Sequence, residues 1–160
     1  MQLIDPRLDP AALAGKYLPI RIRGTIYGIH CDRIRAQAGM NEMLAREDLP
    51  DRVAGFITRR GRLIPVIDLH RSLIGGSVPP MEVIILVIQV RSAGHPGLPV
   101  GLCVDEVGEP VEVKTADILS TAQFSHGHDE LPCLAQVRGR IGALLDADAI
   151  VERALFRSDR

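Results

Sequence analysis

Hydrophobic and polar positions alternate along much of this chain with the period of β-strands. Between residues 18 and 22 every second side chain is apolar, the pattern of a strand with one buried face. Residues 83–90 form a nearly continuous apolar run rich in β-branched side chains, which is typical of a strand covered on both faces. Shorter apolar runs bounded by turn-forming residues occur at 26–31, 53–57, 63–67, 98–107, 109–113, 134–137 and 141–145. Together these runs predict about nine or ten short strands, without the strand–helix rhythm that a parallel sheet needs.

Helical spacing is confined to short segments. Residues 147–156 have apolar side chains at helical spacing behind Asp146, a favourable cap, and they predict a C-terminal helix. Asp68 is expected to cap a second short helix that ends at Gly75-Gly76.

The expected fold class is therefore mostly β, built from antiparallel strands as barrels or a sandwich. Pro79-Pro80 lies near the middle of the chain and favours two small barrels, although one larger barrel stays open. Residues 1–16 are expected to be an N-terminal extension, residues 17–156 the single domain, and residues 157–160 a tail.

The stretch 53–69 predicts a hairpin with an arginine-bearing tip. Two apolar runs of strand length flank a polar turn in which Gly61 can adopt a positive φ. The residues of this turn are Thr58, Arg59, Arg60, Gly61 and Arg62. Pro65 cannot donate to a strand ladder, so its strand is expected at a sheet edge, or Pro65 occupies a bulge.

A second hairpin is expected over residues 134–145, with Arg138 and Arg140 at its tip. Two interpretations of such tips stay open. The arginines could keep an exposed edge soluble, which many β-proteins require. Alternatively Arg60, held by Gly61, could meet a carboxylate or a helix of a partner protein, because guanidinium groups are favoured in such contacts.

Charge and composition narrow the class of partner. The formal net charge is −1, Trp is absent and Phe and Tyr are scarce, so neither a basic footprint nor stacking platforms for nucleic acid are present. The longest apolar run is far shorter than the ~20 residues of a membrane helix. No secretory signal is visible, and an odd number of cysteines without a C-x-x-C pair predicts free thiols in the cytoplasm.

Candidate chemistry is sparse. The best metal-ligand set is His126, His128, Asp129 and Glu130 with Cys133, but its spacing matches no closed four-ligand pattern, so a solvated loop is expected. Cys31 follows His30 at a strand end, where the two side chains should face opposite sides, and Cys103 lies in an apolar strand as a buried small hydrophobe. The carboxylates Asp105, Glu106 and Glu109 are expected to be solvated. The sequence therefore predicts no catalytic residue, no metal and no cofactor.

Several motifs, taken in order, resemble the CheW-like domain family over about residues 17–152. They are Gly24-x-x-Tyr27-Gly28-Ile29, Pro50-x-x-Val53-x-Gly55, Arg60-Gly61-x-Leu63-Ile64-Pro65-Val66-Ile67-Asp68-Leu69, Val100-Gly101-Leu102-Cys103-Val104-Asp105-Glu106-Val107, and Leu144-Leu145-Asp146 with Ile150-Val151. The resemblance implies two SH3-like five-stranded β-barrel subdomains and, because the chain is too short for kinase domains, a free-standing adaptor in bacterial chemosensory signalling. Its implied partners are the cytoplasmic tips of methyl-accepting chemoreceptors and the regulatory domain of a CheA-type histidine kinase.

The resemblance also implies where partners bind. Receptor helices dock between the barrels in that family, and the kinase meets barrel ends. Arg60 falls on the receptor-associated arginine and Ile34 on an apolar groove position. Barrel ends in the family also pair with one another, so self-association of this chain is a further expectation.

Three departures from the family pattern bear on partner choice. Thr58-Arg59 stands where the family usually has Asn-Leu, Ala36 where an acidic residue is common, and Cys133-Leu134-Ala135-Gln136 where an Ile-x-Gly-Val strand is frequent. A divergent paralogue that serves a type IV pilus or another chemosensory-like pathway fits these changes as well. A thiol- or metal-dependent module remains the third alternative.

Overall fold

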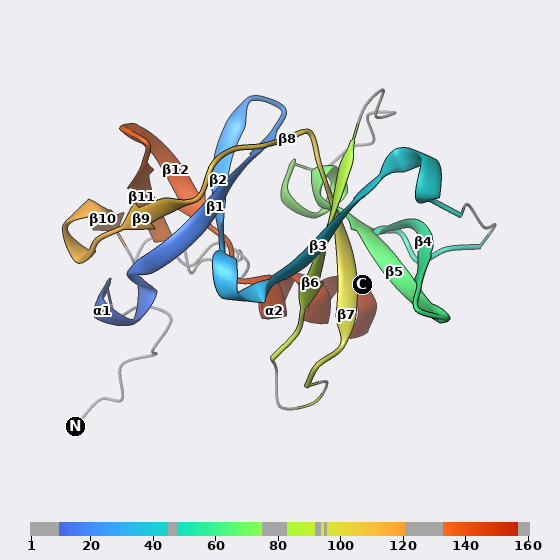
Figure 1. Ribbon diagram of the computed structural model, residues 1–160. Helices are drawn as coiled ribbons and strands as arrows, with labels where there is room; N and C mark the ends of the chain where they lie inside the picture. The colour runs from blue at the N-terminus through green and yellow to red at the C-terminus, as the bar shows by residue number, and fades with distance from the viewer. Residues whose placement is uncertain are drawn as a thin grey trace.

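The computed structural model describes residues 10–44, 48–74, 83–91, 94, 96–120 and 133–156. These residues form two β-sheets joined by short helical turns, as the ribbon shows (Figure 1). The mostly-β prediction is confirmed.

The first sheet combines the two ends of the chain. Its strands are β1 (Gly15–Ile22), β2 (Thr25–His30), β8 (Glu106–Val107), β9 (Val111–Val113), β10 (Ile118–Ser120), β11 (Cys133–Val137) and β12 (Arg140–Leu144). The strand order is β10-β11-β12-β2-β1-β8, and β9 also pairs with β1. The sheet has seven strands, more than the five expected of a barrel. One reason is that β8 and β9 are two separate short strands that both pair with β1.

The second sheet is inserted between β2 and β8. Its strands are β3 (Ile34–Gly39), β4 (Val53–Arg59), β5 (Arg62–Asp68), β6 (Ile84–Gln89) and β7 (Pro99–Val104), in the order β3-β6-β7-β5-β4. A division of the chain at Pro79-Pro80 is therefore wrong. Those prolines lie outside the described residues, between two strands of the same sheet.

Pro65 does not mark an edge strand, because β5 lies between β7 and β4. The parallel pairing of β5 with β7 begins only at Val66, so at Pro65 no donor to β7 is needed. The irregular register falls on β4, between Val53 and Gly55, and not on the proline.

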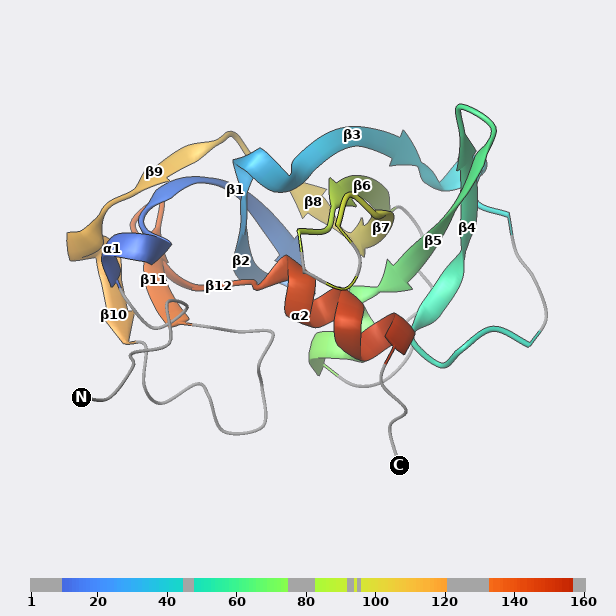
Figure 2. The ribbon, with the colours of Figure 1, turned by 90° about the horizontal axis from the view of Figure 1, so that it is seen from below.

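Short helical segments connect and cover the sheets. They are α1 (Pro10–Leu13), η2 (Cys31–Arg33), η3 (Met40–Glu42), η4 (His70–Ile74), η5 (Thr115–Asp117), α2 (Ala147–Val151) and η6 (Glu152–Phe156). The two predicted caps are present: Asp146 accepts a hydrogen bond from the Ala149 N–H at 3.1 Å, and Asp68 accepts one from the His70 N–H at 3.0 Å. Gly75-Gly76, where the second helix was expected to end, lies outside the described residues. Seen from below, α2 runs beneath the junction of the two sheets (Figure 2).

Among the described residues, buried side chains form three clusters. The largest lies between the sheets and joins side chains of both to α2, as with Ile20, Leu102 and Ile150. The other two fill the barrel interiors, one around Ile57 and Ile85, the other around Cys133, Val137 and Leu144. Each fully buried aliphatic side chain contributes roughly 1.5–3 kcal/mol, so the shared cluster fixes one barrel against the other.

Candidate partner-binding surfaces

Three hairpins in the described part of the chain are closed by the same Arg-Gly turn. At the tip of β4–β5, Arg60 has φ 51° and Gly61 has φ 74°, with Arg59 paired to Arg62 across the turn. Two residues with positive φ define the hairpin turn that matches strand twist. Arg23-Gly24 and Arg138-Gly139 close the other two hairpins with nearly the same angles. The sequence indicated arginines at two of these tips and missed the third, at Arg23.

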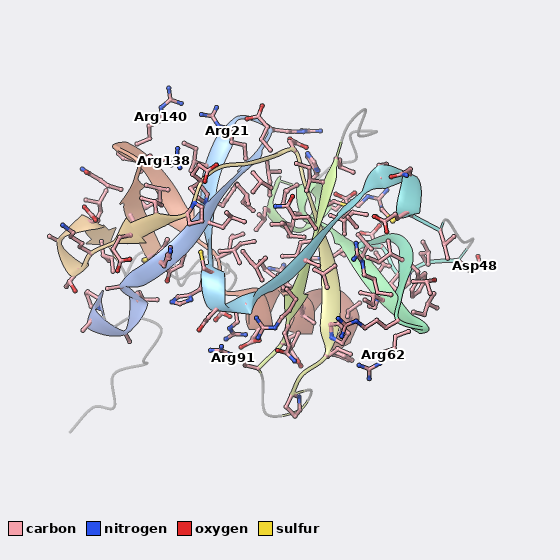
Figure 3. The ribbon with its side chains drawn as sticks, viewed as in Figure 1. Arg21, Asp48, Arg62, Arg91, Arg138 and Arg140 are labelled. Atoms are coloured by element: carbon pink, nitrogen blue, oxygen red, sulfur yellow. The ribbon has the colours of Figure 1, made fainter. Side chains whose placement is uncertain are left out.

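The predicted residues at the β4–β5 tip divide into two groups. Thr58, Arg60, Gly61 and Arg62 are exposed, and the guanidinium groups of Arg60 and Arg62 make no hydrogen bond or ion pair with any described residue. Figure 3 shows Arg62 projecting away from the second sheet. Arg59 differs, because its Nη2 donates to the Gln37 carbonyl oxygen at 3.0 Å.

Arg59 also lies 3.6 Å from a carboxylate oxygen of Glu42. Arg59 stands where the family usually has Leu, so it adds a positive charge to the tip, and the carboxylate of Glu42 balances that charge. The same contacts hold the hairpin against β3 and η3, so Arg59 positions the tip.

Ile34 and Ala36, the other two predicted site residues, both lie on β3 and are half-buried. Ile34 packs against the cluster between the sheets, whereas Ala36 packs against the interior of the second barrel. A register shift in the pairing of β3 with β6 separates them. The Arg59–Gln37 bond brings the β4–β5 tip next to the Ala36 part of β3, while Ile34 lies at the start of that strand.

An apolar surface on the outside of the second barrel was missed by the sequence analysis. Phe56 pairs with Pro65, and on its other side with Leu44, whose N–H donates to the Phe56 carbonyl at 2.6 Å. Leu63 faces the same side, because it pairs with Thr58 two residues along β4. Leu44 is 48% exposed and Leu63 46%.

We call Leu44, Phe56, Leu63 and Pro65 the outer face of β4–β5. The signal for this face was available in the sequence. Gly55 and Ile57 are buried on either side of Phe56, and this period of two within the apolar run 53–57 predicts that Phe56 faces outward.

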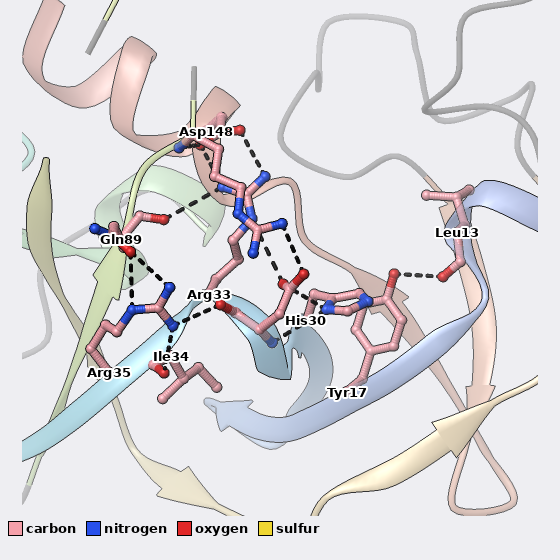
Figure 4. Close-up of polar contacts among 10 residues, drawn as sticks. Leu13, Tyr17, His30, Arg33, Ile34, Arg35, Gln89 and Asp148 are labelled. Atoms are coloured by element: carbon pink, nitrogen blue, oxygen red, sulfur yellow. Dashed lines mark hydrogen bonds and ion pairs between the residues drawn. The ribbon is translucent and has the colours of Figure 1, made fainter. Parts of the chain in front are cut away.

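A polar junction fixes the point at which the chain crosses between the sheets. The Arg33 guanidinium donates two hydrogen bonds to the Asp148 carboxylate, at 2.7 and 2.9 Å (Figure 4). Asp148 also accepts from the Arg91 N–H at 2.8 Å. Hydrogen bonding to Asp148 raises the pKa of Arg33. Burial alone would raise the pKa of Asp148, but the bonds from Arg33 and Arg91 outweigh it, and the pKa is lowered.

A buried histidine was also missed. His70 is 3% exposed, with Nε2 3.0 Å from Asp105 Oδ1 and Nδ1 3.5 Å from Asp68 Oδ1. Asp105 in addition accepts a hydrogen bond from the Arg23 N–H at 2.7 Å. The expectation that Asp105 is simply solvated is therefore wrong: it ties the end of β5 to the β1–β2 hairpin.

The three thiols are poor nucleophiles at neutral pH. Burial raises the pKa of Cys103 to about 12, with Asp68 and Asp105 adding to the effect, and raises that of Cys133 to about 11. Burial raises the pKa of Cys31 as well. His30 places Nδ1 2.7 Å from Asp32 Oδ1 and packs edge-on against Tyr17. A thiolate suited to catalysis needs the opposite environment.

In the part of the chain that the structure describes, no three or more His, Cys, Asp or Glu side chains come together in a way that could hold a metal ion. His126, His128, Asp129 and Glu130 lie outside that part, and Cys133 is fully buried in β11. Within the described ranges, no helix is long and apolar enough to cross a bilayer.

Comparison with known proteins places this architecture. A search of curated proteins gives no match. The structure is similar to that of the scaffolding protein TtCheW from Thermoanaerobacter tengcongensis, with a TM-score of 0.74 at 18% identity, over 88% of this chain and 94% of that one. This likeness shows the fold, two SH3-like subdomains. The family model of the CheW-like domain matches residues 16–155, so the chain belongs to the CheW-like domain family.

Proposed function

We propose that this chain is a non-enzymatic cytoplasmic adaptor, which couples the tips of methyl-accepting chemoreceptors to a CheA-type histidine kinase. Its domain would span residues 17–156. Membership of a family of scaffolding proteins supports the general role. The observation that carries the proposal is the exposed Arg60, displayed on a tight turn beside β3 with no partner among the described residues.

The receptor would bind where the β4–β5 tip meets β3. Arg60 and Arg62 offer guanidinium groups to carboxylates of a receptor helix, and Ile34 and Ala36 supply half-buried apolar surface. Thr58 and Gly61 complete the exposed part of the tip. The turn and the Arg59–Gln37 bond preorganise this surface, so little entropy is lost when the receptor binds.

The kinase regulatory domain would bind the outer face of β4–β5. Leu44 and Leu63 are exposed aliphatic side chains beside Phe56 and Pro65, and apolar contacts at the centre of an interface supply most of its affinity. The two surfaces share one hairpin, so a single rigid element would hold receptor and kinase at a fixed separation.

The test is Arg60→Asn against Arg23→Asn. Asn tolerates the left-handed conformation that both arginines adopt, so each variant removes a guanidinium group without straining its turn. Arg60→Asn should weaken binding to an immobilised receptor cytoplasmic fragment by about tenfold, from the loss of a charge-assisted contact. Arg23→Asn should bind as the unmodified protein does.

Thermal unfolding of both variants separates a binding role from a structural one. The proposal expects melting temperatures that differ little from the unmodified protein. If Arg60→Asn unfolds early and loses binding to the same extent, Arg60 is structural and the proposed receptor contact is wrong. Purification of the chain with its native partners and identification of the receptor that copurifies would decide between flagellar and type IV pilus pathways.

A further inference from the structure

The first sheet opens into a cleft where two of its hairpins diverge. The parallel strands β12 and β2 pair only at Ala143–Tyr27 and Leu144–Gly28. Towards their tips the β1–β2 and β11–β12 hairpins separate, as Figure 1 shows. A cleft of about 360 Å³ lies between them, a volume at the lower end of ligand pockets.

Glycine at position 142 marks where the strands begin to separate. A Cβ on Gly142 would lie 2.8 Å from the Ile26 carbonyl oxygen, so the backbones can approach there only without a side chain. The cleft therefore follows from the pairing of strands that are far apart in the sequence.

The floor of the cleft is apolar and its rim is positively charged. Pro19, Ile26, Val107 and Val137 line it together with the backbone at Gly108. The charged residues of the lining are Arg21, Arg138, Arg140 and Glu106. The rim thus carries an excess of positive charge on a protein whose formal net charge is −1. Figure 3 shows the three arginines gathered at this end of the first sheet.

These arginines are only partly committed to contacts within the protein. Arg21 lies 3.6 Å from Glu106, with both side chains well exposed, a contact of little strength in water. Arg138 donates to the Glu109 carbonyl oxygen at 2.7 Å, which fixes its guanidinium at the rim. The Arg140 guanidinium makes no hydrogen bond or ion pair with any described residue.

We propose that this cleft binds an acidic segment of a partner protein, at a site separate from the receptor and kinase surfaces. One aliphatic side chain of the segment would occupy the apolar floor, and flanking carboxylates would meet Arg138 and Arg140. Glu106 would compete with the ligand for Arg21. None of the described residues that line the cleft has an aromatic side chain on which a nucleobase could stack, so a peptide fits the cleft better than a nucleotide does.

The probe is a five-residue peptide with one central leucine and two glutamates on each side, blocked at both ends. It is titrated into the isotopically labelled full chain, and amide shifts are followed by nuclear magnetic resonance. We expect the largest shifts at Gly108, Gly139 and Arg140, and smaller ones at Gly61, at the other Arg-Gly-Arg tip.

The chain supplies its own matched control. Arg140 and Arg62 occupy the same position after an Arg-Gly turn, so Arg140→Glu and Arg62→Glu make the same charge change in the same local structure. Arg140→Glu should lower the affinity for the peptide about fivefold or more, whereas Arg62→Glu should change this affinity less than about twofold. Glu106→Gln should tighten binding, because it removes the competing carboxylate.

Three results would overturn the proposal. The first is an equal effect of Arg140→Glu and Arg62→Glu, which would mean non-specific attraction. The second is undiminished binding when lysines replace the glutamates or serine replaces the leucine. The third is full displacement by inorganic phosphate at equal concentration, which would make the cleft a simple anion site. None of these results bears on receptor binding by Arg60.

Discussion

The contact between Arg33 and Asp148 is expected to be a main polar determinant of stability. Its two hydrogen bonds are short, and the side chains are only 19% and 24% exposed. Loss of one partner of a fully buried pair costs about 3–5 kcal/mol, and an exposed pair contributes at most about 1 kcal/mol. For this largely buried pair we expect Asp148→Ala to lower the free energy of unfolding by about 2–3 kcal/mol.

The assay is urea unfolding followed by circular dichroism, on Arg33→Met, Asp148→Ala and the double variant. Because the two side chains bond each other directly, the double variant should lose about 1–2 kcal/mol less than the sum of the single losses. Asp51→Asn is the control, since Asp51 pairs with Arg71 at 2.9 Å but its side chain is 91% exposed. That variant should change stability by less than about 0.5 kcal/mol.

The pH dependence of the contact has a definite sign. The folded-state pKa of Asp148 is lowered from 3.8, so its stabilising effect is complete above that pH. It is lost as the pH falls through the lower folded value. The stability difference between the unmodified protein and Asp148→Asn should therefore shrink below about pH 4. The reasoning would be refuted if Asp148→Ala lowered the free energy of unfolding by less than about 0.5 kcal/mol and the double variant with Arg33→Met lost only the sum of the two single losses.

Three further predictions test other parts of the structure. Leu63→Ser should weaken binding of the kinase regulatory domain with little change in stability, whereas Ile64→Ser, which alters a side chain 3% exposed, should cost more than about 2 kcal/mol in urea unfolding. Gly61→Ala should cost about 1 kcal/mol, since a Cβ there meets nothing within 4 Å but φ is +74°. Cys103, whose pKa burial raises to about 12, should react with a thiol reagent at pH 7 only after unfolding; preferential labelling of Cys103 in the folded protein would favour the thiol-dependent alternative.

Local patterns in the sequence predicted most of the strands and their turns, but neither β3 nor β10. Alternation at 18–22 and the apolar run at 83–90 became β1 and β6, and Asp146 caps α2 as expected. These features depend on neighbouring residues, which a sequence displays directly. The exposure of Arg60 followed from the same local logic, because a two-residue turn leaves its tip in solvent.

Features that depend on distant residues were beyond prediction. The insertion of the second sheet rests on short parallel pairings, such as that of β12 with β2, which leave little trace in local periodicity. The prediction that Pro65 lies in an edge strand was wrong because β5 is an internal strand whose pairing with β7 covers only part of its length and does not include Pro65. The contacts of Asp105 and the arginine-rimmed cleft were not predicted for the same reason, because the residues that meet there come from different parts of the chain.

Whether this chain holds a receptor and a kinase at the same time is the central question. A receptor cytoplasmic fragment is immobilised, and capture of a CheA-type kinase regulatory domain is measured as the concentration of the chain increases. The account predicts that the captured kinase rises with the amount of chain bound and falls in the Arg60→Asn and Leu63→Ser variants. Kinase capture that is unchanged or reduced when the chain saturates the receptor would contradict it.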